Sequence, residues 1–341
     1  MKLPRIGELL RRADTLLIIL AALVSYLLYV NYGNVPSGVS APQFAEYEHV
    51  EQAEEEAPTP AHAPRRNAAP VRFLMYNVRD YFVDKDPKRG PHARKLKSRE
   101  DREGVAQVIA SVRPEVVGLI EIGGPAALDD LAERLAARGL IYPHRKVLIR
   151  MKENRALGIL SMHPIVADHS IAECRLLGKS SRTMLRGILD VSVSPEGDER
   201  VFRIIGAHLK SQVDNDPAAA AVQRAQEART LAAHISAVLS RSPDAALLVY
   251  GDWNDGPKSA ALGILTRACL GKLRRLTPLD PAGESWTIFY KDGQEYNTFD
   301  QIYVSPALSK SMGRKSEQGI IPQPSATRQP SDHRALWCDM R

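Results

Sequence analysis

The sequence has little cysteine and lacks several common functional motifs. It contains 3 cysteines in 341 residues, Cys174, Cys269 and Cys338, and their spacing matches no cysteine-based metal site. Because three cysteines cannot all pair within one chain, they form one disulfide at most or stay as buried thiols. There is no internal repeat and no glycine-rich nucleotide loop. These absences argue against a zinc-finger domain, a repeat architecture and a phosphate-binding loop protein.

Positive charge is missing from a long stretch near the N-terminus. No Lys or Arg occurs in residues 13–64, and residues 16–30 are uncharged and strongly apolar. With basic residues only before this run, the positive-inside rule predicts that residues 1–14 are cytoplasmic and residues 15–32 form a single transmembrane helix. The rival interpretation is a cleaved signal peptide and a secreted protein. We expect a single-pass protein of the inner (cell) membrane with its remainder extracytoplasmic or periplasmic.

Net charge separates the following segment from the rest of the chain. Residues 33–70 are rich in Pro, Ala and Glu and have no apolar periodicity, which predicts a disordered linker. Residues 1–70 hold 6 Lys and Arg against 8 Asp and Glu, so the total of +6 leaves residues 71–341 with +8. A basic domain favours anionic partners such as nucleic acid, phosphoesters or anionic lipid, although solubility alone can explain a modest excess.

The apolar patterning of residues 71–341 predicts an α/β (α+β) domain. A strand–helix–strand–helix order comes first and runs of consecutive strands follow, which fits two sheets between helices better than one doubly wound parallel sheet. We expect helices over 98–112, 125–138, 217–240 and 258–268, and strands over 71–78, 115–121, 157–161, 185–193, 201–207, 246–250, 286–290, 298–304 and 334–339.

Polar residues recur at the ends of the predicted strands. Each could be a turn or cap residue on its own, but turns also favour Gly, Pro and Ser, so a set made only of Asn, Asp, Glu and His is improbable as turns. Oxygen ligands without cysteine suit Mg²⁺ or Mn²⁺, and two histidines with a carboxylate suit acid/base work near neutral pH. Together these residues predict phosphoester hydrolysis: Asn77, Glu121, His208, Asp252, Asn254, Asp300, Asp332 and His333.

The same residues fall in motifs that resemble the endonuclease/exonuclease/phosphatase superfamily (DNase I-like), here as a membrane-anchored bacterial-type member. The resemblance covers residues 71–341 and implies a four-layer α/β sandwich, with the site at one edge of two packed mixed sheets. Its motifs, in order, are Tyr76-Asn77-Val78, Ile120-Glu121, Gly158-Ile159-Leu160-Ser161, Ala207-His208-Leu209-Lys210-Ser211, Gly251-Asp252-Trp253-Asn254-Asp255, Phe299-Asp300-Gln301-Ile302 and Ser331-Asp332-His333.

The resemblance also implies a role for each residue near the metal and the attacking water. Glu121 is expected to be the principal metal ligand, with Asn77 and Asp332 completing the shell around Mg²⁺ or Mn²⁺. Asp252 is expected to orient or deprotonate the water, and Asn254 to hold a phosphate oxygen.

Two histidines and two basic residues complete the implied site. His333 is expected to be a general acid/base or a transition-state donor, with Asp300 orienting its ring, and His208 to contact the phosphate. Lys210 is expected either to touch phosphate or to be solvated, and Arg186 either to bind phosphate or to pair with acids.

The leading functional hypothesis is a metal-dependent nuclease that cuts DNA or RNA outside the cytoplasm. The basic charge and a basic loop at residues 83–97 support it, since such a loop grips backbone phosphates. The alternatives are a phosphodiesterase or phosphatase acting on lipid headgroups or other small phosphoesters, and a non-catalytic binding module. We find no exposed aromatic hairpin for inserting into lipid. No protein partner is indicated, and we expect a monomer.

Overall fold

The computed structural model describes residues 69–84, 95–150, 153–177, 182–268, 273–290, 293–313, 316–322 and 329–341. The predicted transmembrane helix, nearly all of the predicted linker, residues 85–94 of the basic loop and Cys269 lie outside these ranges. Within the described ranges, no helix is both long enough and apolar enough to cross a membrane.

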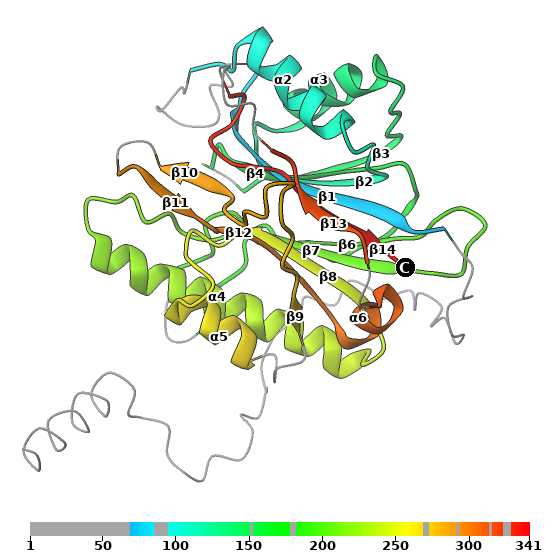
Figure 1. The fold of residues 1–341 in the computed structure, drawn as a ribbon. Helices are drawn as coiled ribbons and strands as arrows, with labels where there is room; N and C mark the ends of the chain where they lie inside the picture. The colour runs from blue at the N-terminus through cyan, green and yellow to red at the C-terminus, as the bar shows by residue number, and fades with distance from the viewer. Residues whose placement is uncertain are drawn as a thin grey trace, which may run out of the picture. The chain divides into compact units, whose positions relative to one another are not determined.

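Two six-stranded mixed sheets pack face to face (Figure 1). In spatial order, the first sheet consists of β13 (Gln318–Ile320), β14 (Leu336–Met340), β1 (Val71–Tyr81), β2 (Val116–Ile122), β4 (Ala156–Ser161) and β3 (His144–Leu148). The second sheet consists of β5 (Ile165–Asp168), β6 (Leu189–Val193), β7 (Phe202–His208), β8 (Ala246–Asp252), β12 (Asp300–Val304) and β9 (Arg274–Arg275).

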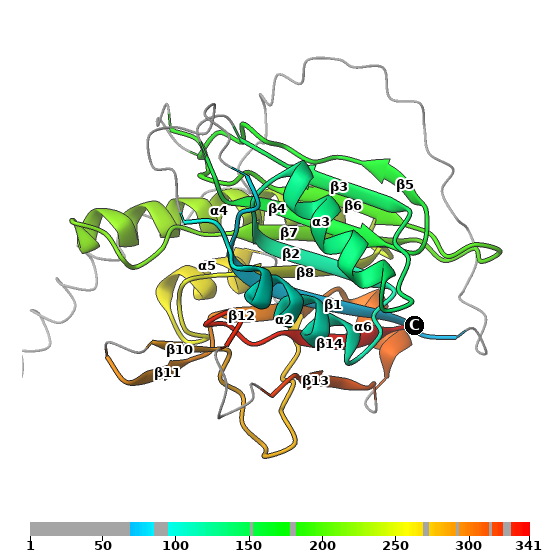
Figure 2. The same cartoon turned by 90° about the horizontal axis from the view of Figure 1, so that it is seen from above.

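Helices cover the outer face of each sheet (Figures 1 and 2). The first sheet carries α2 (Arg99–Ala110) and α3 (Pro125–Ala136), and the second carries α4 (Pro217–Arg241) and α5 (Ala260–Ala268). A short helix, α6 (Pro306–Met312), follows β12, and the hairpin of β10 (Ile288–Tyr290) and β11 (Glu295–Asn297) forms a separate two-stranded sheet. The prediction of two packed mixed sheets flanked by helices is confirmed.

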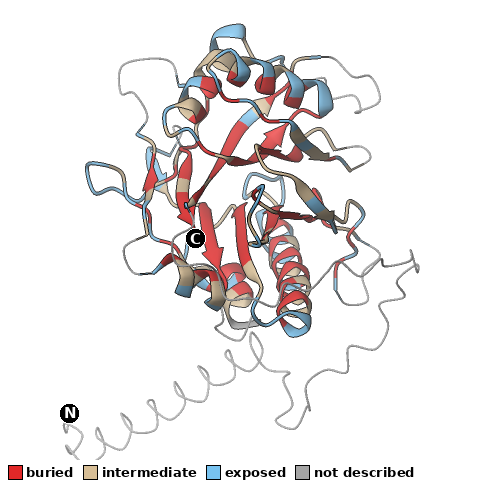
Figure 3. Cartoon of the chain, turned by 90° about the vertical axis from the view of Figure 1, so that its right-hand side faces the viewer, coloured by how far each residue is buried: buried red, intermediate tan, exposed pale blue. Residues whose placement is uncertain are grey.

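The core occupies three interfaces between the layers, and the strands are buried while the outer helix faces are exposed (Figure 3). The central cluster lies between the two sheets and contains Phe73 and Tyr250, whose ring centroids are 5.2 Å apart. The hydroxyl of Tyr250 donates to the carbonyl of Gly158, 3.3 Å away. A Cβ at Gly118 or Gly206 would come within 2.6 Å of the Tyr250 side chain, so the two glycines make room for this ring.

Local signals account for the helix starts, and their weakness accounts for the missed elements. Ser98 caps α2 by accepting a hydrogen bond from the Asp101 amide at 3.0 Å, as its spacing predicts. Asp216 caps α4 in the same way. The strand β3 begins His144-Arg145-Lys146 and forms a polar edge, so it lacks the apolar run that identifies a strand. The other elements missed from sequence are short: β5, β9, β11, α6 and β13.

Candidate active site

Polar side chains from both sheets meet at one edge of the sandwich. β1 runs parallel to β2, and β7 runs parallel to β8, so each pair presents its carboxyl ends at the same edge. β12 is antiparallel to β8, so its first residue, Asp300, pairs with Asp252, which also pairs with His208. The structure therefore brings together six residues predicted from sequence: Asn77, Glu121, His208, Asp252, Asp300 and His333.

A buried histidine–aspartate pair forms one side of this cluster. Nδ1 of His333 lies 2.7 Å from Oδ2 of Asp300, and the amide of Asp300 donates to Oγ1 of Thr287 at 3.0 Å. Burial opposes protonation of His333, but the charge of Asp300 and its hydrogen bond outweigh this effect and raise the pKa of His333 to about 10. The ring is therefore a cation at neutral pH in the free protein.

Asp252 stands at the centre of the cluster. Its Oδ2 accepts a hydrogen bond from the side-chain amide of Asn77 at 2.9 Å. The same oxygen lies 3.6 Å from Nε2 of His208 and 3.8 Å from Nε2 of His333. Its Oδ1 accepts from the amide of Asn254 at 2.9 Å. Groups from both sheets thus fix the position of the Asp252 carboxylate.

Burial shifts the acidities of Asp252 and His208 in opposite directions. Burial and the nearby charge of Asp300 raise the pKa of Asp252 to about 6. Burial and the positive charge of Arg186 lower the pKa of His208 well below its ordinary value. At neutral pH, Asp252 is then a carboxylate of useful basicity, while His208 is a neutral ring.

Glu121 forms the other side of the cluster. Its Oε2 accepts from the amide of Asp80 at 3.1 Å and lies 3.0 Å from Nε of Arg155. Its Oε1 faces inward, 3.9 Å from Nε2 of His208. Burial raises the pKa of the Glu121 carboxyl, and the charge of Arg155 opposes that shift. Arg155 also donates to Asp80 at 2.7 Å, so it fixes both carboxylates.

Backbone conformations that side chains rarely adopt are concentrated at this edge. The φ angles are 43° at Arg79, 48° at Asp80, 64° at Glu121 and 50° at Asn254. None of these residues is glycine, so each position costs on the order of 1 kcal/mol unless local contacts compensate. Hydrogen bonds of the cluster hold the three segments that contain these four residues, as expected where a site fixes its geometry against local preference.

Asn254 and Arg186 contact the same backbone carbonyl beside His208. The Asn254 side-chain amide donates to the carbonyl of Leu209 at 3.0 Å, and the Arg186 guanidinium donates to it at 3.4 Å. Arg186 is 6% exposed, and its Nε makes no hydrogen bond among the described residues but lies 3.9 Å from Oε2 of Glu153. Two of the three predicted substrate-binding residues, Asn254 and Arg186, therefore contact the segment that follows His208.

Lys210 and Asp332 are engaged in ion pairs at the rim. The ammonium of Lys210 lies 2.7 Å from Oδ2 of Asp214, four residues along the chain. Asp332 lies 3.4 Å from Nε of Arg79, and its side chain is 33% exposed. These two predicted site residues are tied less closely to the cluster than the other members.

The family model that matches this chain is the Endonuclease/Exonuclease/phosphatase family, and the match covers residues 76–333. The chain belongs to this family. It is therefore a hydrolase that acts on ester bonds. No curated protein matches the chain closely enough to count as a relative.

Solved structures show the same fold at low sequence identity. Beta toxin 275-280 from Staphylococcus aureus has a TM-score of 0.56 and 14% identity, covering 79% of this chain and 99% of that one. The human Nocturnin catalytic domain with bound sulfate has a TM-score of 0.53 and 16% identity, covering 80% of this chain and 94% of that one. Danio rerio TDP2 with a single strand DNA product has a TM-score of 0.53 and 15% identity, covering 80% of this chain and 100% of that one. At these identities the similarity establishes the fold.

The family depends on divalent metal ions, and the site has suitable donors. Asp252, Asp300 and His333 each offer one ligand atom, and these atoms lie within 4.8 Å of one another. His333 is already bound to Asp300 and held as a cation, so it is a poor ligand. Oδ1 of Asp332 is buried without a hydrogen-bond partner among the described residues, which suits a hard cation. The oxygen donors of the family site thus fit such an ion.

Sequence reasoning missed several residues that shape the site. Arg155 and Asp80 bracket Glu121, and Thr287 accepts hydrogen bonds from the amides of Phe299 and Asp300. Arg155 stands just before β4, and Asp80 just beyond the Tyr-Asn-Val motif. The only signal was their position next to recognised motifs, since an arginine before a strand is ordinary.

An exposed aromatic hairpin stands beside the site, which corrects the expectation that the chain has none. β10 and β11 pair antiparallel, and Ile288 of β10 forms a bridge with His333. Tyr290 is 45% exposed and Tyr296 is 61% exposed. The ring centroid of Phe289 lies 4.6 Å from that of Tyr296. The hairpin was missed because β11 has only three residues and is polar in part.

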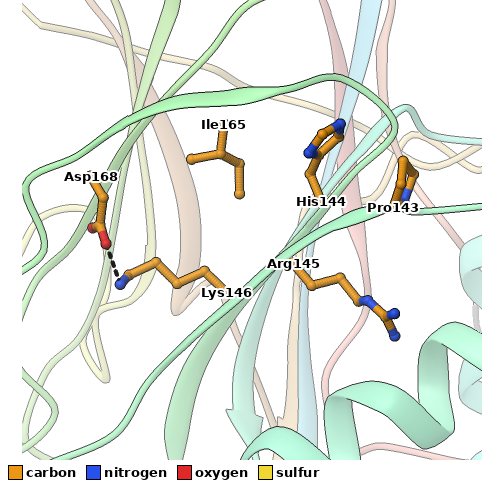
Figure 4. Close-up of a pocket in the computed structure, with 6 residues that line it drawn as sticks. All are labelled: Pro143, His144, Arg145, Lys146, Ile165 and Asp168. Carbon is orange, nitrogen blue, oxygen red and sulfur yellow. Dashed lines mark hydrogen bonds and ion pairs between the residues drawn. The ribbon is translucent and has the colours of Figure 1, made fainter.

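A basic hollow on the surface lies away from this cluster (Figure 4). It opens between the edge strands β3 and β5, and an ion pair between Lys146 and Asp168 crosses it. His144 pairs with Ser161, the last residue of β4. Glu121 lies near the other end of this strand, at Ala156. The hollow is therefore separate from the active-site edge.

Proposed function

We propose that the protein is a divalent-metal-dependent nuclease that cuts phosphodiester bonds of DNA or RNA. We further propose that residues 15–32 anchor it as a monomer in the cell membrane, with the catalytic domain outside the cytoplasm. The observation that carries the catalytic proposal is the position of His333, which is hydrogen-bonded to Asp300 and has its Nε2 3.8 Å from Oδ2 of Asp252 at the edge where both sheets end.

In the proposed reaction, Asp252 orients the attacking water and accepts its proton. The water oxygen bonds to phosphorus, and the bond from phosphorus to the leaving oxygen breaks. His333 donates from Nε2 to the phosphoryl group and supplies the proton that the leaving oxygen needs, with Asp300 holding the ring. His208 and Asn254 donate to non-bridging oxygens, since both lie within the cluster around Asp252.

The metal belongs on the carboxylate side of the site. Glu121, Asn77 and Asp332 would hold it, and Mg²⁺ or Mn²⁺ suits their oxygen donors. Such a cation would stabilise the negative charge of the phosphoryl oxygens. Arg186 would contact an adjacent phosphate oxygen through its Nε, which makes no hydrogen bond among the described residues and lies 3.9 Å from Oε2 of Glu153. Lys210 would do so only after leaving Asp214.

Nucleic acid is the favoured substrate because the hairpin and the charge of the domain both suit it. The tyrosines of the hairpin offer ring faces for stacking bases next to the hydrolytic cluster. The excess of positive charge after residue 70 would attract a polyanion. The complex of Danio rerio TDP2, a protein of similar fold, with a single strand DNA product supports this choice.

A phosphodiesterase that acts on lipid headgroups is the second candidate. The same exposed aromatic hairpin favours it, because tyrosine rings also suit a membrane interface. The predicted anchor would keep the domain near a bilayer. Salt separates the two candidates, since binding to backbone phosphates weakens steeply as salt rises.

The deciding experiment uses the full-length chain purified in mild detergent. It is incubated with plasmid DNA, RNA, sphingomyelin vesicles and an inositol phosphate, with Mg²⁺, with Mn²⁺ and with EDTA. Metal-dependent nucleic-acid cleavage that Asp252→Ala and His333→Ala both abolish supports the nuclease. Cleavage of lipid or inositol phosphate alone overturns the nuclease and leaves the site roles in place.

A further inference from the structure

The helix α4 carries a buried carboxylate that the reaction itself does not use. Glu227 is 0% exposed, in the middle of the helix. Its Oε1 accepts the amide of Leu185 at 3.1 Å, and its Oε2 accepts the amide of Lys210 at 2.7 Å. Gln223, one turn earlier, donates to Oε1 at 3.3 Å. One carboxylate thus binds backbone from two separate segments.

Both of these segments carry residues of the active site. Leu185 immediately precedes Arg186, whose positive charge helps to keep His208 neutral. Lys210 comes two residues after His208, at the end of β7. Glu227 therefore fixes the position of Arg186 relative to His208 through their backbones.

Arg224 extends the same connection to a third segment. It is 7% exposed, and its guanidinium donates to the carbonyl of Lys210 at 3.2 Å. It also donates to Oδ2 of Asp255 at 3.2 Å. Asp255 follows Asn254, whose amide holds Asp252. The helix therefore contacts the segment before β6, the segment after β7 and the segment after β8, and each of these segments adjoins the site.

We propose that Glu227, together with Arg224, is a positioning residue for phosphoester hydrolysis that sets His208 and Arg186 against Asp252. A carboxylate can accept from two backbone amides at once, whereas an amide side chain must turn a donor towards one of them. A small displacement of a reacting group lowers the rate far more than it lowers binding. The proposal rests on the proposed roles of His208 and Asp252, and it is independent of which phosphodiester is the substrate.

Thr230 supplies a matched control on the same helix. It is 0% exposed, and its Oγ1 accepts the amide of Leu177 at 3.0 Å. This is also a hydrogen bond from α4 to loop backbone, but Leu177 lies in a segment that carries no site residue. Thr230→Val therefore removes the same kind of contact without touching the segments of the site.

The test compares full-length wild type, Glu227→Gln and Thr230→Val in detergent. The readouts are kcat and KM for bis(4-nitrophenyl) phosphate with Mn²⁺, and the midpoint of thermal unfolding. We expect Glu227→Gln to lower kcat by roughly 10- to 100-fold with KM changed less than threefold. Thr230→Val should keep kcat within twofold, even where both variants lose similar thermal stability.

A kcat for Glu227→Gln within threefold of wild type overturns the proposal, as does an equal fall in both variants. If Glu227→Gln does not fold, Arg224→Gln takes its place, since Arg224 contacts the same segment. Its kcat must then fall at least tenfold for the proposal to stand. Because the artificial diester carries no base or lipid, this result is distinct from failure of the nuclease proposal.

Discussion

His333 and Asp300 form a buried pair in which Nδ1 lies 2.7 Å from Oδ2, and the two residues come from different segments of the chain. Asp300 is the first residue of β12. His333 lies in the loop that precedes β14, where its amide donates to Oγ of Ser331 at 3.1 Å. The pair therefore depends on tertiary packing, and the charge of His333 depends on the pair.

Replacing Asp300 by Asn should abolish the elevated pKa of His333. The neutral amide removes the charge and the charge-assisted hydrogen bond that raise the pKa of His333 most, so burial, opposed only by the charges of Asp252 and Asp332, lowers that pKa from about 10. We expect His333 to lose its proton at neutral pH and kcat to fall by about 10²- to 10⁴-fold. Ring ¹⁵N shifts measured by NMR would check the charge. A His333 that still titrates near 10 would contradict the pairing.

Activity should require Asp252 in its charged form. Asp252→Asn keeps the shape and removes the base, so we expect kcat to fall by about 10²- to 10⁴-fold. With a free-protein pKa of about 6, the acid limb of the pH–rate profile should lie at or below pH 6, because a bound cation favours the carboxylate. The exposed Asp244→Asn is the control and should leave the profile unchanged. An acid limb well above pH 7 would contradict this assignment.

Glu121 should decide the affinity for metal. Its Oε1 faces the interior of the cluster, so Glu121→Gln removes a charged donor at the site. We expect Mn²⁺ binding, measured by electron paramagnetic resonance, to weaken by about 10- to 100-fold or more. Glu133→Gln on the exposed face of α3 is the control. Equal Mn²⁺ affinity for the two variants would move the metal away from Glu121.

Stability at low pH should depend on Asp190, which lies outside the site. Burial opposes its ionisation, but hydrogen bonds from His234 at 2.7 Å and from Arg203 outweigh burial and hold the pKa of Asp190 below its usual value. The stabilisation is therefore present above the unfolded pKa near 3.9 and is lost as pH falls through the folded pKa.

Asp190→Asn should accordingly cost on the order of 3 kcal/mol of unfolding free energy at pH 7. Urea unfolding at a series of pH values would show this difference shrinking below about pH 4. The exposed Asp129→Asn provides a comparison that lacks burial. A difference that stays constant down to pH 2 would show that the charge of Asp190 does not contribute.

The tyrosines of the β10–β11 hairpin should contribute to binding of nucleic acid. Stacking of a base is worth about 1–3 kcal/mol, so Tyr296→Ala should raise KM for single-stranded DNA by about 5- to 150-fold with little change in kcat. Tyr296→Phe keeps the ring and should behave like wild type. If Tyr296→Ala leaves DNA binding intact but weakens adsorption to vesicles, the hairpin serves a membrane surface instead.

Sequence patterns located most of the site because the site lies where long, apolar strands stop. Strands such as β2 and β8 are buried on both faces and read as unbroken apolar runs, so Glu121 and Asp252 stand out at their ends. Contacts across the fold could not be predicted in this way. In the sequence, Glu227 cannot be told from an ordinary exposed glutamate of a helix. Only the packed structure shows that its carboxylate accepts hydrogen bonds from two backbone amides distant in the chain. The hairpin at Tyr296 was missed for a different reason, because β11 has only three residues and is polar in part.

Tyr250 limits how far the two sheets can move relative to each other. Its ring fills the space left by Gly118 and Gly206, one in each sheet, so sliding one sheet past the other would drive backbone into the ring. The strands that carry the two halves of the active site are therefore held in register by this ring. Rim loops that carry no site residue can lengthen, shorten or be replaced, and substrate preference can be redesigned there while the two sheets keep their register.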